Sequence, residues 1–130
     1  MATGRDRTAV VIEDDLDIRN LVCAILEQGG FQVSGATTGR EGVDAVRTEQ
    51  PTVVTLDIGL PDIDGYEATR QLRRREAGGR RTPVVALTAG AVEGERERCL
   101  AAGMDDYLTK PIDPADVDAV LTRWLSEAVA

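Results

Sequence analysis

The chain has 130 residues, a formal net charge of −8 and no histidine. This length suits a single domain that buries roughly two thirds of the surface its unfolded chain exposes. The acidic balance disfavours contact with a nucleic-acid backbone, so we expect no direct nucleic-acid partner. The absence of histidine excludes a phosphohistidine within the chain, a histidine-based triad and histidine-ligated zinc.

The two cysteines, Cys23 and Cys99, lie in separate helix-like segments without a CxxC pair, and both are expected to be reduced packing thiols. No apolar stretch approaches the ~20 residues of a membrane span, and the first ten residues carry charges. We therefore expect a cytoplasmic protein without membrane insertion. It would form one domain over residues 1–130, with a core at about 8–126 and short flexible ends.

Short β-branched runs alternate with longer segments of helical period, which is typical of βαβ units and a parallel sheet. The expected strands are residues 8–13, 31–36, 52–57, 83–88 and 105–109. The expected helices are residues 15–29, 39–49, 64–76, 91–103 and 114–127. Such a sheet binds ligands at the carboxyl ends of its strands.

Local signals mark the helices with different strength. Capping residues predict three helix starts, at Thr38 with Glu41, Asp64 with Glu67, and Asp113 with Pro114. Apolar stripes predict that the first and last helices pack on the sheet, through Ile18, Leu21, Val22, Ile25 and Leu26, and through Val117, Val120, Leu121, Trp124 and Leu125. The fourth helix is rich in charge and has few large apolar residues, so we expect it to be loosely held.

Four of the apolar runs end in a polar residue with a chemical use. Glu13 and Asp14 follow the first run, Asp57 closes the third, and Thr88 and Lys110 end the fourth and fifth. Adjacent acids repel each other and are stabilised by a hard cation with oxygen ligands. Mg2+ fits best, because it accepts one or two carboxylates, keeps several waters and binds phosphate oxygens.

Asp57 is the expected acceptor of a phosphoryl group, since a carboxylate can form an acyl phosphate when the negative charges are neutralised. Asp14, Asp57, a backbone carbonyl near Gly59, waters and the phosphoryl group would complete the Mg2+ site. Lys110 would pair with the phosphoryl oxygens, and Thr88 would donate a hydrogen bond to them. Each residue alone also fits an ordinary turn, cap, strand or surface position, and only their coincidence favours a site.

An ordered set of segments resembles the receiver domain of bacterial response regulators. The matching segments are residues 11–15, 56–65, 86–89 and 106–111. The resemblance implies an α/β, flavodoxin-like doubly wound (βα)5 fold, with a five-stranded parallel sheet in the order 2-1-3-4-5 and helices on both faces. Residues 96–111 resemble receivers attached to hybrid histidine kinases more than those attached to transcription factors.

The resemblance also implies site roles. Asp57 would be the phosphoacceptor, Lys110 the phosphate partner, and Asp14 the direct ligand of Mg2+ or, alternatively, Mn2+. Glu13 would reach the metal through a water. In the family the bond between Lys110 and Pro111 is often cis.

Further roles concern signalling. By the same resemblance Thr88 and Tyr107 would form a switch pair, and Ala89 would leave room for the phosphoryl group. The chain would take that group from a histidine kinase or a histidine phosphotransfer protein, and then bind a downstream protein or pass the group along a phosphorelay. It would catalyse only its own phosphorylation and dephosphorylation. No output domain fits after Ser126, so we expect the output to be another protein or the rest of a larger polypeptide.

Two other functions compete with this interpretation. A Mg2+-dependent phosphatase with an aspartyl nucleophile is the alternative, although haloacid dehalogenases place a second Asp two residues after the nucleophile, where this chain has Gly59. An EF-hand loop around Gly65 fails, because Leu60 would occupy its first ligand position. Asp62 and Asp64 are instead expected to be a turn residue and a helix cap.

One basic tract remains, formed by Arg73, Arg74 and Arg75 with Arg80 and Arg81. It fits either a docking patch for an acidic partner or a solvated helix end. The helix end is favoured, because positive charge is stabilised near C-terminal carbonyls.

Overall fold

The chain alternates five strands with five helices in a computed structural model that describes residues 7–76, 79, 81–90 and 93–129. The strands are β1 (Thr8–Ile12), β2 (Gln32–Ala36), β3 (Val53–Asp57), β4 (Val84–Thr88) and β5 (Asp106–Thr109). The helices are α1 (Leu16–Gln28), α2 (Gly39–Glu49), α3 (Gly65–Glu76), α4 (Glu95–Ala102) and α5 (Pro114–Val129). All neighbouring strands are parallel, in the order β2-β1-β3-β4-β5, so the predicted topology is confirmed.

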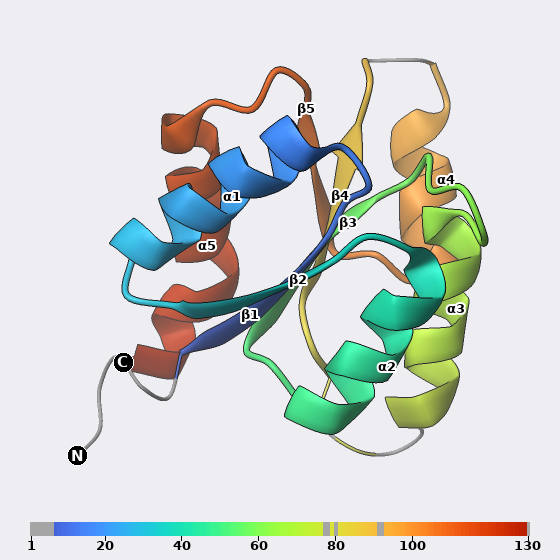
Figure 1. The fold of residues 1–130 in the computed structure, drawn as a ribbon, viewed down its shortest axis with the longest axis horizontal. Helices are drawn as coiled ribbons and strands as arrows, with labels where there is room; N and C mark the ends of the chain where they lie inside the picture. The colour runs from blue at the N-terminus through green and yellow to red at the C-terminus, as the bar shows by residue number, and fades with distance from the viewer. Residues whose placement is uncertain (1–6, 77–78, 80, 91–92, 130) are drawn as a thin grey trace.

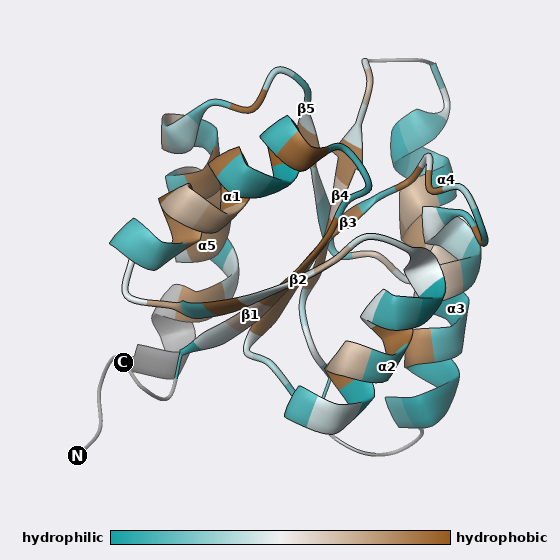
Figure 2. Ribbon diagram, in the orientation of Figure 1, coloured by the Kyte–Doolittle hydropathy of each residue, from teal (hydrophilic) through white to brown (hydrophobic). Residues whose placement is uncertain are grey.

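The sheet forms the middle of three layers, with α1 and α5 on one face and α2, α3 and α4 on the other (Figure 1). The central strands β1, β3 and β4 are mostly hydrophobic, whereas the helices alternate hydrophobic and hydrophilic residues (Figure 2). One core cluster lies beneath α1 and α5 and includes Val11, Val22, Leu26, Val117 and Val120. The other lies beneath α2, α3 and α4 and includes Val10, Ile12, Val43, Leu72 and Cys99.

The two predicted apolar stripes pack on the sheet, but they are narrower than the sequence suggests. Leu21 is 41% exposed and Trp124 is 38% exposed, so neither belongs to the core. Both cysteines are free, as predicted. Within the described residues no helix is long and apolar enough to cross a membrane.

Side-chain caps begin four helices, and at α5 the predicted Asp113 accepts a hydrogen bond from the Ala115 amide at 2.9 Å. Asp15, Thr38 and Asp64 each accept a hydrogen bond from the backbone amide three residues later, at 3.1, 3.1 and 2.8 Å respectively. Asp62 accepts a hydrogen bond from the first amide of α2, that of Gly39, at 2.8 Å. The prediction that Asp62 and Asp64 act in turns and caps is therefore confirmed, and the loop after β3 is tied to α2.

The fourth helix is shorter than the predicted range of 91–103. It begins at Glu95, because Gly94 before it has a φ of 85°, in the left-handed region that interrupts an α-helix. Residues 91 and 92 lie outside the described part of the chain. Gly103, with a φ of 106°, ends the helix.

Helix α4 buries few apolar side chains. Its buried apolar residues are Cys99 and Ala102, as its sparse stripe predicts. Glu95 is also buried, and its carboxylate accepts a hydrogen bond from the Tyr66 hydroxyl of α3. Arg98 lies 3.7 Å from the same carboxylate. A polar contact that the sequence did not reveal thus joins the start of α4 to α3, and the loose attachment of α4 stays a prediction.

Adjacent arginines at the end of α3 have different environments. Arg73 points inward, where its guanidinium donates hydrogen bonds to the carbonyl oxygens of Thr82 and Gly103, at 2.9 and 2.8 Å. It also pairs with Asp105 at 2.8 Å, and only 15% of its side chain is exposed. Arg73 is therefore a structural residue that joins α3 to the segments before β4 and β5.

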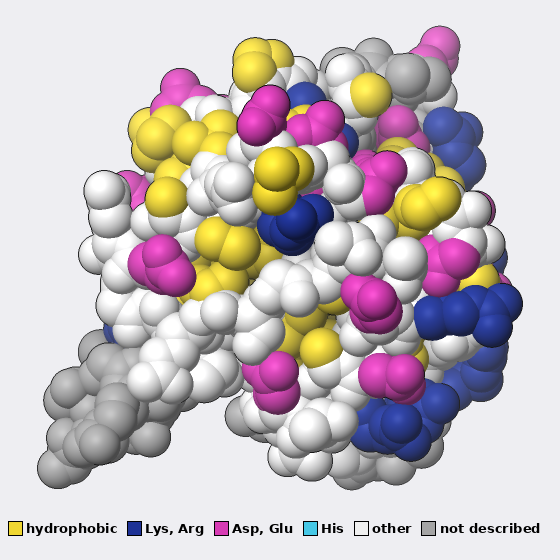
Figure 3. Space-filling view, viewed as in Figure 1, with side chains coloured by type: hydrophobic (Ala, Val, Ile, Leu, Met, Phe, Trp, Pro, Cys, Tyr) yellow, Lys and Arg dark blue, Asp and Glu magenta, His cyan; other side chains and the backbone are white. Residues whose placement is uncertain are grey.

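The other arginines of the basic tract also differ in whether they are paired within the fold or exposed to solvent. Arg81 joins the Arg73 network, whereas Arg74 and Arg75 are exposed. Exposed basic side chains over α2 and α3 are visible in Figure 3. Arg80 lies outside the described residues. The prediction of a solvated helix end is therefore confirmed for Arg74 and Arg75, which are exposed, and wrong for Arg73, which points inward.

Candidate functional site

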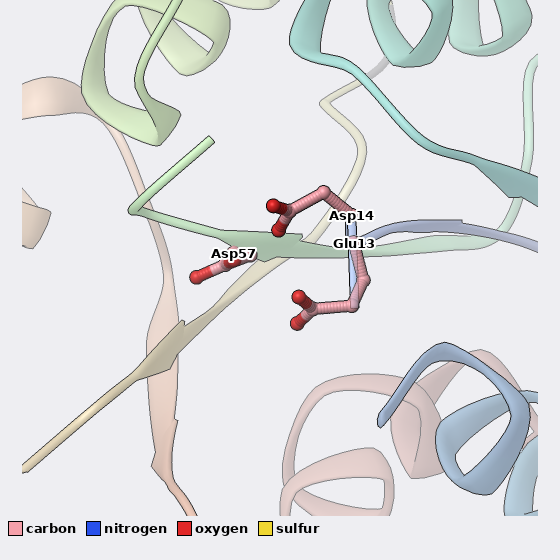
Figure 4. A group of neighbouring side chains, drawn as sticks. All are labelled: Glu13, Asp14 and Asp57. Atoms are coloured by element: carbon pink, nitrogen blue, oxygen red, sulfur yellow. The ribbon is translucent and has the colours of Figure 1, made fainter. Parts of the chain in front are cut away.

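Three carboxylates meet at the carboxyl edge of the sheet. Glu13 and Asp14 directly follow β1, and Asp57 is the last residue of the neighbouring strand β3. One oxygen from each carboxylate lies within 4.8 Å of the others. In Figure 4 the Asp14 and Glu13 side chains extend above and below the β3 ribbon, both toward the end of that strand where Asp57 lies. The parallel register thus brings together acids that are more than 40 positions apart in sequence.

The surroundings of Asp57 fix its position. Its side chain is nearly buried, with 6% of the residue exposed, and its Oδ1 accepts a hydrogen bond from the Gly59 amide at 3.1 Å. Gly65 at the start of α3 packs closely on the chain after β3. A Cβ on Gly65 would lie 2.8 Å from the Asp57 carbonyl oxygen and 2.6 Å from Ile58 Cα. Only glycine allows this approach, which holds α3 against the end of β3.

Lys110 provides the positive charge that faces these acids. Its Nζ lies 3.4 Å from Asp57 Oδ1 and 3.3 Å from Glu13 Oε1. The Lys110 amide donates a hydrogen bond to the Thr88 carbonyl oxygen at 2.8 Å, which holds it beside β4. The peptide bond between Lys110 and Pro111 is cis.

Glu13 is fully buried and only partly satisfied. Its Oε2 accepts a hydrogen bond from the Asp15 amide at 3.1 Å, but its buried Oε1 has no hydrogen-bond partner among the described residues. The pKa of Glu13 is raised to about 7, with burial as the largest cause. Asp57 contributes to the rise, whereas the Asp15 amide and the Lys110 ammonium oppose it. The site therefore resists holding all of its negative charges without a further cation.

The donor set fits a hard divalent cation. Three carboxylates share one ammonium within the described part of the site, so the cluster carries surplus negative charge when all three are ionised. Carboxylate oxygens are ligands that Mg2+ and Mn2+ accept, whereas neither cysteine belongs to the cluster. The buried Glu13 Oε1 is consistent with the same interpretation, because within the described residues it makes no hydrogen bond and shares the Lys110 ammonium, at 3.3 Å, with Asp57.

The structure also locates the remaining predicted residues. Thr88 is fully buried at the end of β4, and its hydroxyl makes one long contact of 3.5 Å, to the Gly90 carbonyl oxygen. Ala89 is exposed next to it. Tyr107 of β5 is partly buried and packs against the core cluster beneath α2, α3 and α4. Gly59 is exposed, and a Cβ there would have a contact only with Asp57 Oδ1, at 3.9 Å.

One neighbour of the acids was missed in the sequence. The Arg19 guanidinium of α1 donates a hydrogen bond to the Glu13 carbonyl oxygen at 2.9 Å. The available signal was weak, because Arg19 is one charged residue beside the apolar stripe of its helix.

The fold and the site together define a class of signalling domain. The sequence matches the response regulator receiver domain over residues 9–122, and the chain therefore belongs to this family of two-component signalling domains. The curated relatives include longer proteins of different kinds, of which this chain spans only part. Hybrid signal transduction histidine kinase G of Dictyostelium discoideum is 37% identical over 117 residues, which cover 88% of this chain and 3% of the kinase. The phosphate regulon transcriptional regulatory protein PhoB of Klebsiella pneumoniae is 41% identical over 127 residues, which cover 95% of this chain and 55% of PhoB.

A solved structure gives the same result. The receiver domain of the sensor histidine kinase PA1611 from Pseudomonas aeruginosa PAO1 is 38% identical, with a TM-score of 0.83 over 92% of this chain and 98% of that domain. That crystal structure holds a magnesium ion coordinated in its active site cleft. Kinase receivers are therefore among the relatives, as residues 96–111 suggest, but a transcriptional regulator matches at similar identity.

Proposed function

We propose that this receiver is a phosphoacceptor switch in which Asp57 takes a phosphoryl group from a phosphohistidine of a partner protein. The observation that carries the proposal is the meeting of three carboxylates and the Lys110 ammonium at one edge of the sheet. Transfer to a carboxylate requires this kind of charge compensation, because nucleophile and phosphoryl group are both anionic.

In the proposed transfer an Asp57 oxygen attacks the phosphorus atom. The phosphorus–nitrogen bond of the donor breaks, its imidazole keeps the electron pair, and Asp57 becomes an acyl phosphate. Lys110, which lies 3.4 Å from Asp57 Oδ1, pairs with the carboxylate before transfer and with the phosphoryl oxygens afterwards. The exposed position of Ala89 leaves room for the incoming group.

Asp14 and Asp57 would hold Mg2+ together with the Gly59 carbonyl oxygen, and Glu13 would contact the ion through a water. When bound, Mg2+ supplies positive charge to the phosphoryl oxygens and to the carboxylates. Mn2+ would serve in its place, because it accepts the same ligands. The magnesium ion in the similar PA1611 receiver supports this assignment.

The proposed response starts at Thr88. Among the described residues its hydroxyl makes one contact, a long one of 3.5 Å to the Gly90 carbonyl oxygen, so a turn of the side chain would let it donate a hydrogen bond to a phosphoryl group on Asp57. Tyr107 would then change its position between solvent and the core beneath α4. Such a local shift would alter the surface formed by α4 and β5, because packed elements have discrete arrangements.

The donor would be a histidine kinase or a histidine phosphotransfer protein, since the chain has no histidine of its own. The kinases among the relatives support this class of partner. The phosphorylated receiver would bind a downstream protein or pass the group along a phosphorelay in the cytoplasm. It would catalyse its own phosphorylation and dephosphorylation and turn over no other substrate.

Intact-mass measurement after incubation with acetyl phosphate and Mg2+ tests the proposal. We expect the mass of one added phosphoryl group on the wild type, and none after chelation of the metal or in Asp57→Asn. Asp44→Asn is a matched control, because Asp44 is an exposed acid of α2 that pairs with Arg47. It should be phosphorylated like the wild type. A phosphoryl group on Asp57→Asn, or none on the wild type, would refute the proposal.

The same preparation tests the alternative of a phosphatase. Sustained multiple turnover of a generic phosphate ester would favour that class. We expect none, because Gly59 provides no carboxyl group for a general acid two residues after Asp57.

A further inference from the structure

We propose that Arg19 is a positioning residue for the metal ligand Asp14, and that Gly35 is the small residue that admits the Arg19 side chain. This inference rests on the proposed function, because it assigns Arg19 a task in the same site. Arg19 lies in the second turn of α1 and is half-buried.

The position of Asp14 depends on its backbone. Asp14 is exposed, and among the described residues its carboxylate makes neither a hydrogen bond nor an ion pair. On its N-terminal side, the Glu13 carbonyl oxygen accepts a hydrogen bond from Arg19 Nη1 at 2.9 Å. On its C-terminal side, the Asp15 amide donates a hydrogen bond to Glu13 Oε2 at 3.1 Å.

These two hydrogen bonds hold the two peptide groups that meet at the Asp14 Cα atom. A peptide group is planar, so holding its carbonyl oxygen or its amide also orients the rest of the group. Because both flanking planes are held, the direction in which the Asp14 side chain leaves the backbone is held as well. Arg19 supplies one of the two restraints, through a charged donor that makes a stronger hydrogen bond than a neutral one.

Gly35 of β2 explains how the Arg19 side chain reaches this carbonyl. Gly35 pairs with Val11 in the sheet, and a Cβ on it would lie 3.2 Å from Arg19 Cδ. Its φ does not lie in the left-handed region, so the backbone does not require glycine there. Space for the stem of Arg19 is the requirement that Gly35 meets.

The consequence concerns the affinity of the site for its cation. A carboxylate that leaves the backbone in a fixed direction loses less conformational freedom when it binds a metal. Loss of the Arg19 hydrogen bond should therefore weaken Mg2+ binding, while the nucleophile Asp57 and its partner Lys110 stay in place. Saturating Mg2+ should restore the maximal rate of phosphorylation.

Isothermal titration calorimetry with Mg2+ on the unphosphorylated chain tests this inference. We expect Arg19→Met, which keeps an apolar stem but loses the donor, to bind Mg2+ about tenfold more weakly than the wild type. Arg19→Lys keeps a charged donor and should recover part of the affinity. With acetyl phosphate, Arg19→Met should need about tenfold more Mg2+ for half-maximal rate and reach the same maximum.

Gly35→Val separates positioning from stability. Valine favours a strand more than glycine does, so this variant should remain folded while it displaces the Arg19 side chain. Its Mg2+ affinity should fall in the same direction as that of Arg19→Met. Arg47→Met is the matched control, because it removes an exposed arginine of α2 that is paired with Asp44, outside the site.

Wild-type affinity in Arg19→Met would overturn the inference, and so would an equal loss in Arg47→Met; wild-type affinity in Gly35→Val would overturn the role given to Gly35. A wild type that accepts the phosphoryl group while Arg19→Met keeps full Mg2+ affinity would overturn this inference alone. A wild type that accepts none would overturn the proposed function, and calorimetry would still decide whether Arg19 controls metal affinity.

Discussion

Two pairs of adjacent acids lie at opposite ends of the sheet, and their charges are compensated to different degrees. Asp105 and Asp106 lie at the start of β5. The Asp105 carboxylate pairs with Arg73 at 2.8 Å and Arg81 at 2.9 Å, and it accepts a hydrogen bond from the Val84 amide at 2.9 Å. Asp106 accepts hydrogen bonds from Arg123 and Trp124. Every charge of this pair is matched by a nearby donor of the chain itself.

Glu13 and Asp14, at the end of β1, are compensated much less. Within the described residues these two acids and Asp57 share one ammonium, that of Lys110, which lies 3.3 Å from Glu13 and 3.4 Å from Asp57. The comparison teaches that acidity alone does not mark a site. Acids that the chain neutralises stabilise the fold, whereas acids left with surplus charge require a ligand from outside.

The largest expected effect is on the free energy of unfolding, when the arginine network around Asp105 is broken. Arg73→Met should lower the free energy of unfolding by about 3 kcal/mol, because it leaves Asp105 short of a buried partner and removes the Arg73 donor from the Thr82 carbonyl oxygen, whereas the Gly103 carbonyl oxygen keeps Arg81. Arg74→Met is the matched control and should change it by less than about 0.5 kcal/mol, since Arg74 is 65% exposed. Denaturant titration measures both variants, and equal losses would contradict the distinction between the two arginines.

A smaller effect should appear at Glu13, as a dependence of the free energy of unfolding on pH. The pKa of Glu13 is raised from 4.5 to about 7 in the folded state, so between these values the folded chain holds more protons than the unfolded chain. Its contribution to the free energy of unfolding should therefore fall as pH rises through this window, when a chelator removes divalent cations. Glu13→Gln should flatten the profile measured by denaturant titration. A wild-type profile that Glu13→Gln leaves unchanged would exclude Glu13 as its cause.

The smallest expected effect is a gain. Asp57→Asn should raise the free energy of unfolding by about 1 kcal/mol in the presence of chelator, because it removes one of the mutually repelling charges from around Glu13. The asparagine still accepts the hydrogen bond of the Gly59 amide. Excess Mg2+ should stabilise the wild type more than the variant, by mass action. Thermal unfolding with and without Mg2+ measures both, and a loss of stability in Asp57→Asn under chelation would argue against crowded charge.

The site edge could be predicted from local sequence because the fold places distant strand ends together. The run Val53–Leu56 ends in Asp57 and the run Val10–Ile12 ends in Glu13, and a parallel sheet brings such ends to one edge. Helix starts followed from caps such as Thr38. Local pattern was therefore sufficient for the order of elements along the chain and for the edge at which the acids lie, whereas the pairing of β1 with β3 followed from the family resemblance.

Long-range polar pairing could not be predicted in this way. Arg73 and Asp105 are 32 positions apart, and Tyr66 and Glu95 are 29 apart, and no periodicity links such residues. Arg73 also lies in a run of identical arginines, so only its direction in space distinguishes it from Arg74. Gly94 was a visible signal for the late start of α4, since glycine adopts the left-handed conformation that interrupts the helix.

The most direct test of the central claim is a crystal structure of the chain soaked with Mn2+, located by its anomalous scattering. The cluster of three carboxylates at the edge of the sheet should bind one ion. The ion should lie about 2.0–2.2 Å from an oxygen of Asp14 and from an oxygen of Asp57, with the Glu13 carboxylate farther away. An ion bound at Asp105 and Asp106 instead, or ligated by Asp14 without Asp57, would contradict the claim that these acids form one metal-dependent phosphoacceptor site.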